Sequence, residues 1–481
     1  MTGIRPDLRA GPAPDIALRI AESVRAHGTR PEVVARCRRW LDEVARWSRL
    51  EVERADLAEL DGWEDDAAEG RIRHASGKFF AVEGIAVTRP GAAVERWDQP
   101  ILNQPEVGIL GVLVRFSDGI LQLLLQAKVE PGNAGGLQLS PTVQATRSNY
   151  TQVHGGRPVP YLDYFRRQDR HRVLADVRQS EQGSWFLRKT NRNMIVQVEE
   201  EVELLDGFRW FSLGEVYELL QTDDLVNMDT RTVLSCLPAA GPGVTGGGGP
   251  LAAALVRSFD TRTRPLNDTA AVLSMITDAR VLADGGSRGV PLPALADWHR
   301  TDGAIRHRSG AFFEVIGVRV RASGREVGSW AQPMIASVAD GVVAFAVTRV
   351  DGVLHVLTQL RAEPGFADVV ELAPTVQCTP GNYDHLPAAA RPPYLDVVLG
   401  ADPAAVHLDV LLSEEGGRFY RTRNRYLVVE ADGLPARPGY VWLTLAQLAD
   451  LLKHSQYVNV QARTLVACLH ALSGAGTRED L

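Results

Sequence analysis

The stretch QAKVEPGNAGGLQLSPTVQATRSNY at residues 126–150 is written a second time, as QLRAEPGFADVVELAPTVQCTPGNY at residues 359–383. The two stretches are separated by a constant offset of 233 residues (359 minus 126), and Glu-Pro-Gly, Pro-Thr-Val-Gln and Asn-Tyr keep their places in both. The same offset relates Trp97-x-Gln99-Pro100 to Trp330-x-Gln332-Pro333 further upstream. A register this constant indicates that the chain is one unit duplicated in tandem.

The repeated unit is far longer than one turn of a solenoid, so each copy is expected to fold as a whole domain. A chain of 481 residues is also too long for a single compact core. We predict a first repeat over residues 1–237, a linker over residues 238–250 and a second repeat over residues 251–481. Consecutive glycines at residues 246–249 give this linker its flexible composition.

Each copy has the pattern of a mixed sheet with a few helices. Ser212-x-x-Glu215 is a capping box that predicts the start of a helix, Thr444-x-x-Gln447 repeats it, and Asn227 suits the N-cap of the next helix. Helical spacing precedes each copy, at residues 16–26, 32–47 and 268–283. Apolar runs predict strands near residues 79–88, 107–116, 120–128 and 193–199, and near 312–321, 341–349, 352–360 and 426–430. We therefore predict an α+β fold with flanking helices.

Composition excludes several classes of protein. The net charge of −7 argues against a general nucleic-acid binder, and no apolar run is long enough to cross a bilayer. The N-terminus lacks the apolar core of a secretory signal, so a cytoplasmic location is expected. Four cysteines, at positions 37, 236, 378 and 468, form no CxxC pair, and we predict no metal site.

Polar side chains are concentrated between residues 126 and 193 of the first copy, in the runs QAKVEPGN, LSPTVQATRSNY, QSEQGSWF and RKTNRN. Amides, hydroxyls and a few cations in this number suit a polar, anionic, hydroxylated ligand. Arg188, Arg192 and Arg231 are candidates to clamp a diphosphate. Trp97, Tyr150 and Trp185 are candidates to stack on a base or a sugar. Taken singly, each of these residues is as well explained by a turn, a cap or the core.

The two copies differ at positions where chemistry is expected. Lys128 is replaced by Arg361 and Lys189 by Thr422, whereas glutamate at 130 and 363 and glutamine at 144 and 377 are common to both copies. We therefore predict that the first copy carries the chemistry and that the second keeps a degenerate pocket. The alternative is that the second copy drifted as a structural partner without any effect on the site.

The motifs QAKVEPGN, LSPTVQATRSNYT, QSEQGSWF, KTNRNM and VNMDTRTVLSCL resemble those of the NDP-hexose 2,3-dehydratases, over nearly the whole chain. The resemblance implies a duplicated Nudix-like fold, a homodimer, two nucleotide-sugar pockets per chain of which one is catalytic, and no metal or redox cofactor. It implies dehydration of dTDP-4-keto-6-deoxyglucose to dTDP-3,4-diketo-2,6-dideoxyglucose in deoxysugar (antibiotic glycoside) biosynthesis, coupled to a 3-ketoreductase. The glutamate-rich magnesium-binding helix of Nudix hydrolases is missing from the sequence.

Such a dehydration needs a base for the C3 proton, a proton donor for the departing C2 hydroxyl and donors for the enolate. The sequence leaves the roles open: Glu130 or Glu181 as base, and Lys128 or Lys189 as base or enolate stabiliser. Tyr150, Tyr161 or His154 remain candidates for the proton donor. The residues that we predict to bind substrate are Trp97, Gln126, Asn133, Gln144, Thr146, Asn149, Tyr150, His154, Tyr161, Gln182, Arg188, Asn191, Arg192, Asn193 and Arg231. Those predicted for the second pocket are Trp330, Arg361, Gln377, Tyr383, Arg421, Asn424, Arg425 and Arg463. Two other functions stay open: a metal-dependent nucleotide-sugar hydrolase and a non-catalytic nucleotide-sugar binding protein.

Overall fold

The computed structural model describes residues 16–25, 29–66, 68–147, 158–167, 170–244, 248–323 and 327–474. Over these ranges both repeats carry a seven-stranded sheet with one shared strand order, β10-β11-β6-β7-β12 in the first and β22-β23-β18-β19 followed by β24 in the second. Two short strands complete each sheet. In the first repeat β8 pairs with β7 and β9 with β6, and in the second repeat β20 pairs with β19 and β21 with β18. The strands of the first large sheet are β6 (Gly108–Ser117), β7 (Ile120–Lys128), β8 (Gln138–Ser140), β9 (Val143–Ala145), β10 (Arg172–Ser180), β11 (Thr190–Gln197) and β12 (Phe208–Ser212). Those of the second are β18 (Gly341–Val350), β19 (Val353–Ala362), β20 (Val370–Pro374), β21 (Val376–Cys378), β22 (Val406–Ser413), β23 (Arg423–Glu430) and β24 (Tyr440–Leu443). The predicted α+β fold in tandem duplicate is thus confirmed.

Helices follow the sequence signals closely. Ser212 caps α5 with the predicted capping box, Thr444 does the same for α10, and the Asn227 side chain accepts from the Thr230 amide at the start of α6. These caps are confirmed because they depend only on residues three positions apart. The helices are α1 (Ile16–Val24), α2 (Arg30–Ala45), α4 (Leu162–Arg166), α5 (Leu213–Leu220), α6 (Met228–Leu234), α7 (Pro250–Phe259), α8 (Thr269–Val281), α9 (Leu395–Leu399), α10 (Leu445–Leu451) and α11 (Val460–Leu472). None of the helices described is long and apolar enough to cross a membrane.

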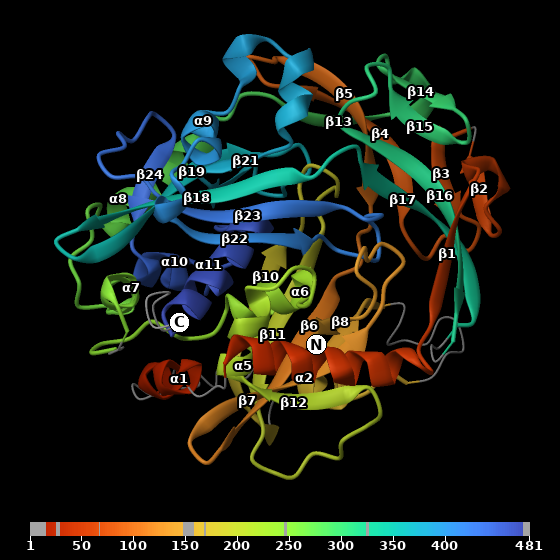
Figure 1. The fold of residues 1–481 in the computed structure, drawn as a ribbon. Helices are drawn as coiled ribbons and strands as arrows, with labels where there is room; N and C mark the ends of the chain where they lie inside the picture. Colours follow the sequence, from red (N-terminus) through yellow and green to blue (C-terminus); the bar gives the residue numbers. More distant parts are fainter. Residues whose placement is uncertain are drawn as a thin grey trace, which may run out of the picture.

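Two smaller antiparallel sheets are built by strand exchange between the repeats. Strand β1 (Leu50–Ala55) precedes the first repeat's own strands but pairs with β16 (Phe313–Ala322) of the second. Reciprocally, β13 (Gly286–Val290) pairs with β4 (Ala81–Thr88) of the first repeat, and Figure 1 shows both pairings on the same side of the molecule. The remaining strands of these sheets are β2 (Trp63–Asp66), β3 (Arg71–His74), β5 (Arg96–Asn103), β14 (Trp298–Thr301), β15 (Ala304–His307) and β17 (Ser329–Ser337). Each repeat therefore completes a sheet of the other.

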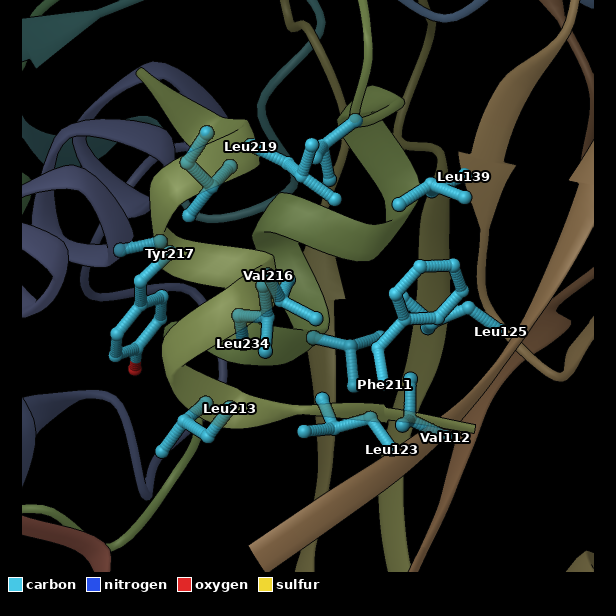
Figure 2. Packing of buried hydrophobic residues seen from close by; sticks show 14 of the residues in the cluster. Val112, Leu123, Leu125, Leu139, Phe211, Leu213, Val216, Tyr217, Leu219 and Leu234 are labelled. Atoms are coloured by element: carbon cyan, nitrogen blue, oxygen red, sulfur yellow. The ribbon is translucent and has the colours of Figure 1, made fainter. Parts of the chain in front are cut away.

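The main core of the first repeat lies between its large sheet and the helices α5 and α6. Figure 2 shows Leu123 and Leu125 of β7 facing Val216 and Leu219 of α5 across this layer. The same cluster includes Ala467 of α11, so the helix layers of the two repeats share one apolar interior. Apolar burial of this kind stabilises by about 25 cal/mol per Å², which makes the contact between repeats a part of the fold itself.

Two buried arginines join the repeats at the centre of this helix layer. Arg231 on α6 donates to the carbonyl of Ser413 in the second repeat at 2.6 Å, and Arg463 on α11 donates to that of Ser180 in the first at 2.5 Å. Both side chains are completely buried. Arg231, predicted to clamp a diphosphate, and Arg463, predicted for the second pocket, both have to be corrected, because their guanidinium groups are enclosed by the interface and hydrogen-bonded to backbone carbonyls.

The Glu-Pro-Gly turn of each repeat is a second joint between them. The Gly132 amide donates to the carbonyl of Gly416 at 2.7 Å, and its own carbonyl accepts from the Arg421 amide at 2.8 Å. Gly365 makes the mirror-related contacts with Gly183 and Arg188. These backbones approach so closely that a Cβ on Gly132 would lie 1.7 Å from the carbonyl oxygen of Phe419. The recurrence of Glu-Pro-Gly is thereby explained by the contact between repeats.

Candidate active site

A cavity of about 940 Å³ opens between the repeats and is lined by both of them. The large sheet of the first repeat contributes polar side chains at the ends of its strands. The small sheets contribute aromatic and basic side chains, and the loop after β22 contributes one acidic and one basic residue. The charged, amide and aromatic side chains of the cavity lining include Lys128, Glu130, Gln144, Glu181, Lys189, Asn191, Asp229, Trp63, Lys78, Arg321, Trp330, Glu415 and Arg418.

Lys128, Glu130 and Gln144 form one hydrogen-bonded group at the end of β7. The Lys128 Nζ donates to Gln144 Oε1 at 2.9 Å and lies 3.5 Å from Glu130 Oε1. The Gln144 amide in turn donates to Glu130 Oε1 at 2.9 Å. The ammonium group is therefore held at the cavity wall by two neighbours, which is the arrangement needed to place a positive charge at a fixed point of a ligand.

Glu181 and Lys189 lie on the two sides of the turn that joins β10 to β11. Glu181 Oε1 accepts from the Asn191 amide at 2.7 Å, whereas its Oε2 has no hydrogen-bond partner among the described residues. Lys189 donates to the carbonyl of Glu106. Burial lowers the pKa of Lys189 to about 8, because the charged ammonium loses its hydration. At a pH near 8, about half of the molecules therefore carry a neutral Lys189 amine, which can accept a proton.

Glu415 and Arg418 enter the cavity from the second repeat. The Glu415 carboxylate accepts from the backbone amides of Gly417 at 2.9 Å and Arg418 at 2.8 Å. Burial and the nearby Glu130 raise the pKa of Glu415 to about 7. Burial likewise raises the pKa of Glu181. Together with Asp229 they are four of the five carboxyl residues that line the cavity, the fifth being Asp61. The described residues place no group of three or more metal-ligating side chains in metal-binding geometry.

Seven of the residues predicted for the first pocket line this cavity. Four of them are Lys128, Glu130, Glu181 and Lys189, so the structure brings together all the candidates for the base and for the enolate stabiliser. The seven are Lys128, Glu130, Gln144, Thr146, Glu181, Lys189 and Asn191. Asn149, Tyr150 and His154 lie outside the described residues.

Other predicted residues point elsewhere, for reasons that differ. Arg192 forms a bidentate ion pair with Asp176 on the outer face of the sheet, because alternate side chains of a strand point to opposite faces. Arg425 does the same with Asp409 in the second repeat. Tyr161 donates to the carbonyl of Glu203 and is thereby fixed away from the cavity lining.

Gln182 enters the other repeat. Its amide donates to Glu414 Oε2 at 2.8 Å, whereas the equivalent residue of the second repeat, Glu415, lines the first cavity. The prediction of Gln182 as a ligand of the first pocket therefore has to be corrected, because each of these loops crosses between repeats. Trp330 is corrected in the opposite direction: predicted for the second pocket, it lines the first.

The remaining predicted residues have local roles in the described chain. Asn133 donates to the carbonyl of Gly136 within its turn, and Asn193 is completely buried with its amide near the carbonyl of Asn191. Arg188 is exposed, with φ of 51°, and its backbone amide donates to Gly365. Trp97 donates to Gln99, the counterpart of the Trp330–Gln332 contact, and Gln126 is a half-buried position of β7; neither is part of the cavity lining.

The second repeat fills the equivalent place with protein contacts. Arg361 donates to Glu363 Oε1 at 2.8 Å and to the carbonyl of Gln377 at 3.1 Å. The Asn459 amide donates to Gln377 Oε1. Burial raises the pKa of Tyr383, and the nearby positive charge of Arg361 opposes this rise. The Asn424 amide donates to Glu414, as the Asn191 amide donates to Glu181 in the first repeat. The Arg421 side chain is exposed, and its backbone amide donates to the carbonyl of Gly132. Where the first cavity has Lys189, this site has the uncharged Thr422.

Sequence reasoning missed Asp229, Glu415, Arg418, Lys78 and Trp63 as cavity residues. A signal was present for two of them, since Asp229 stands opposite Gln461 and Glu415 opposite Gln182 when the copies are aligned. The meaning of these differences depends on which cavity each loop enters. That property is set by contacts between repeats and is not visible in the sequence.

Comparison with known proteins finds one family along both copies. The sequence profile described as NDP-hexose 2,3-dehydratase matches residues 34–237 and 269–469. A dTDP-4-dehydro-6-deoxy-alpha-D-glucopyranose 2,3-dehydratase of Amycolatopsis orientalis is 47% identical over 440 residues, covering 90% of this chain and 89% of that protein. Enzymes with the same name from Saccharopolyspora spinosa and Streptomyces violaceoruber are 48% identical over 444 residues and 47% identical over 442 residues. Both alignments cover 91% of this chain. They cover 91% of the Saccharopolyspora spinosa enzyme and 97% of the Streptomyces violaceoruber enzyme.

Proposed function

This chain belongs to the NDP-hexose 2,3-dehydratase family, and we propose that it removes water across C2 and C3 of dTDP-4-keto-6-deoxyglucose in the cavity between its repeats. The product is dTDP-3,4-diketo-2,6-dideoxyglucose. The observation that carries the proposal is the meeting of Lys128, Lys189 and four carboxyl groups in one cavity. These are groups that can take up, release and stabilise protons and negative charge without a metal ion.

The C4 ketone makes the C3 proton acidic, so the first step is its removal by a base. We assign this step to Lys189, because its lowered pKa of about 8 provides a neutral amine near physiological pH. The negative charge then moves to the C4 oxygen. Lys128, positioned by Gln144 and Glu130, is the cation proposed to stabilise this enolate. Glu130 thereby becomes a positioning partner of Lys128, and the charge of Glu181 opposes the effect of burial on the pKa of Lys189.

The nucleotide is proposed to occupy the part of the cavity formed by the small sheets. Trp63 and Trp330 offer aromatic faces for the base. Lys78 and Arg321 offer cationic groups for the diphosphate. Trp330 and Arg321 come from the second repeat, so the proposed substrate site requires both copies.

The second repeat is proposed to keep a degenerate nucleotide-sugar pocket that carries out no reaction. Three observations support this: Arg361 is bound to Glu363 and Gln377, Thr422 replaces the proposed base, and Gln461 replaces Asp229. We further infer a Nudix-like fold for each repeat, a homodimer in solution and a cytoplasmic location. We also infer a place in antibiotic glycoside biosynthesis, in which a 3-ketoreductase consumes the unstable diketone.

The experiment is to incubate the protein with dTDP-4-keto-6-deoxyglucose and a chelator, with a 3-ketoreductase and its reductant to trap the product. Loss of the C2 oxygen, seen by mass spectrometry, is the expected result. Release of dTMP would instead identify a hydrolase, and an unchanged substrate would overturn the dehydratase assignment for this sugar.

Matched variants test the choice of cavity. Lys189→Ala should abolish turnover and Thr422→Ala, at the equivalent place in the second repeat, should leave it within about twofold of the parent. Lys128→Ala and Arg361→Ala form a second pair with the same expected asymmetry. Equal losses within each pair would contradict the assignment of the reaction to the first cavity.

A further inference from the structure

The proposed dehydration needs a proton for the C2 oxygen, because hydroxide is a poor leaving group. None of the donors suggested by the sequence is placed to supply it in the described part of the chain. Tyr161 is bound to the carbonyl of Glu203, and Tyr150 and His154 fall outside the described residues. The inference that follows rests on the proposed function and concerns which cavity side chain gives this proton.

Asp229 lines the cavity from the first turn of α6, two residues after the N-cap Asn227. The residue is only 4% exposed, and its Oδ1 has no hydrogen-bond partner among the described residues. A buried carboxylate without donors is costly, whereas a neutral carboxyl group with one proton to give is tolerated there. The geometry therefore favours the protonated form of Asp229.

The charged groups that face Asp229 act mainly in the same direction. Burial raises its pKa well above the usual value, and Glu181, Glu130 and Glu415 raise it further, opposed by the more weakly acting Lys128. A helix N-terminus normally favours an ionised aspartate. Here three carboxyl groups and the loss of water outweigh the helix.

Each of the three carboxyl groups that raise the pKa of Asp229 accepts at least one hydrogen bond, whereas Oδ1 of Asp229 has no partner in the described part of the chain. Glu130 accepts from Gln144, Glu181 accepts from Asn191, and both oxygens of Glu415 accept from backbone amides. Hydrogen bonds of this kind favour the carboxylate. Among these four carboxyl groups, the surroundings thus stabilise the ionised form of Asp229 least.

The second repeat gives an independent indication. Gln461 occupies the equivalent position on α11, is 7% exposed, and its Oε1 also lacks a hydrogen-bond partner among the described residues. Both repeats thus carry at this position a buried polar side chain with an unpartnered oxygen, and in the second repeat that side chain is neutral. Only the side chain in the first repeat can transfer a proton.

We propose that Asp229 is the general acid that protonates the departing C2 hydroxyl. Lys189 takes the C3 proton, the C2–C3 double bond forms, the C2–O bond breaks, and the oxygen leaves as water with the proton of Asp229. The enol product then gains a proton at C2 from the Lys189 ammonium. Its C3 hydroxyl gives a proton to the Asp229 carboxylate, so both residues return to their starting states and the net change is loss of one water.

The test separates proton removal from elimination. Asp229→Asn keeps the shape and neutrality of the side chain but cannot give up a proton. In D2O this variant should still exchange the C3 hydrogen of dTDP-4-keto-6-deoxyglucose for deuterium, while dehydration falls by about 10²- to 10⁴-fold. Lys189→Ala should lose both activities, and Gln461→Asn should lose neither.

A substrate with a better leaving group provides the second arm. For the 2-deoxy-2-fluoro analogue, fluoride release by Asp229→Asn should stay within about tenfold of the parent, because fluoride departs with less protonation. Dehydration of the natural sugar at a near-parent rate by Asp229→Asn would overturn the proposal. So would an equal loss on the hydroxyl and fluoro substrates. Asp229→Gln, which copies the second repeat, gives the same readouts if the asparagine variant does not fold.

The two proposals fail in different ways. If the parent enzyme neither exchanges C3 nor dehydrates the sugar, the proposed function is wrong. If the parent does both and Asp229→Asn also does both, only the assignment of the acid is wrong.

Discussion

Gly132→Ala is expected to damage the joint between the repeats. A Cβ at this position would lie 1.7 Å from the Phe419 carbonyl oxygen and 2.8 Å from that of Gly416, whereas real Cβ contacts essentially never fall below 3.0 Å. Both neighbours are backbone atoms, so the two loops must separate by more than 1 Å. Separation breaks the bonds from Gly132 to Gly416 and from Arg421 to Gly132, of 2.7 and 2.8 Å.

The expected loss of stability is about 3–5 kcal/mol. Two hydrogen bonds contribute about 1 kcal/mol each, and overpacking of a tight contact adds about 1–3 kcal/mol. Urea unfolding followed by circular dichroism measures the shift in the transition midpoint. Gly289→Ala is the matched control, because a Cβ there meets nothing within 4 Å.

Activity gives a second measurement of the same change. Gly132 follows Glu130 by two residues and holds it against the loop that carries Glu415, so Gly132→Ala should also reduce dehydration in the folded fraction. Gly365→Ala, with a predicted contact of 1.8 Å to Phe186, should destabilise equally but act on the second repeat's pocket. An unfolding midpoint for Gly132→Ala equal to that of Gly289→Ala would refute the reasoning about the joint.

Three further results are expected. The rate of C3 exchange should rise about tenfold per pH unit below pH 8 and level off above it, because Lys189 acts as base only when neutral and its pKa is about 8; a fall through this range in the pH–rate profile would exclude it as base. Burial raises the pKa of Glu371 from 4.5 to about 7, so the stability it contributes is present below pH 4.5 and lost as the pH rises through 7. Glu371→Gln, which copies Gln138 of the first repeat, should therefore raise the unfolding free energy by up to about 3 kcal/mol at pH 8 and by little at pH 4.5, measured by urea unfolding at both values; equal effects at the two pH values would contradict this. Trp330→Ala should weaken binding of the nucleotide sugar by at least tenfold in calorimetry, whereas Trp97→Ala, at the equivalent position of the first repeat, should not abolish turnover. Loss of turnover in Trp97→Ala with unchanged binding in Trp330→Ala would place the substrate in the second pocket.

The candidate site was predictable where its parts are close in sequence. Lys128, Glu130 and Gln144 come from one hairpin end and the turn beside it, so the run that contains them already brings them together. The helix caps at Ser212 and Asn227 are local in the same way. Residues separated by a few positions need no knowledge of the rest of the fold.

The site was not predictable where it depends on side-chain direction or on the partner repeat. Arg192 lies one residue from Asn191, yet strand alternation turns it to the outer face, where Asp176 neutralises it. Arg231 has the chemistry of a phosphate ligand but is enclosed by the other repeat. In both cases the residue type was suited to the predicted role and the location was not.

The duplication itself, the α+β class, the family and the group of residues around Lys128 were determined by the sequence alone, since each is written as a pattern within one copy or as a match between copies. The tertiary structure decided which copy supplies each wall of the cavity. Strands β1 and β13 are exchanged, and the loops that carry Gln182 and Glu415 cross to the opposite repeat. Backbone hydrogen bonds and apolar burial between the repeats fix these crossings, and such contacts join residues more than 180 positions apart, where no sequence pattern links them.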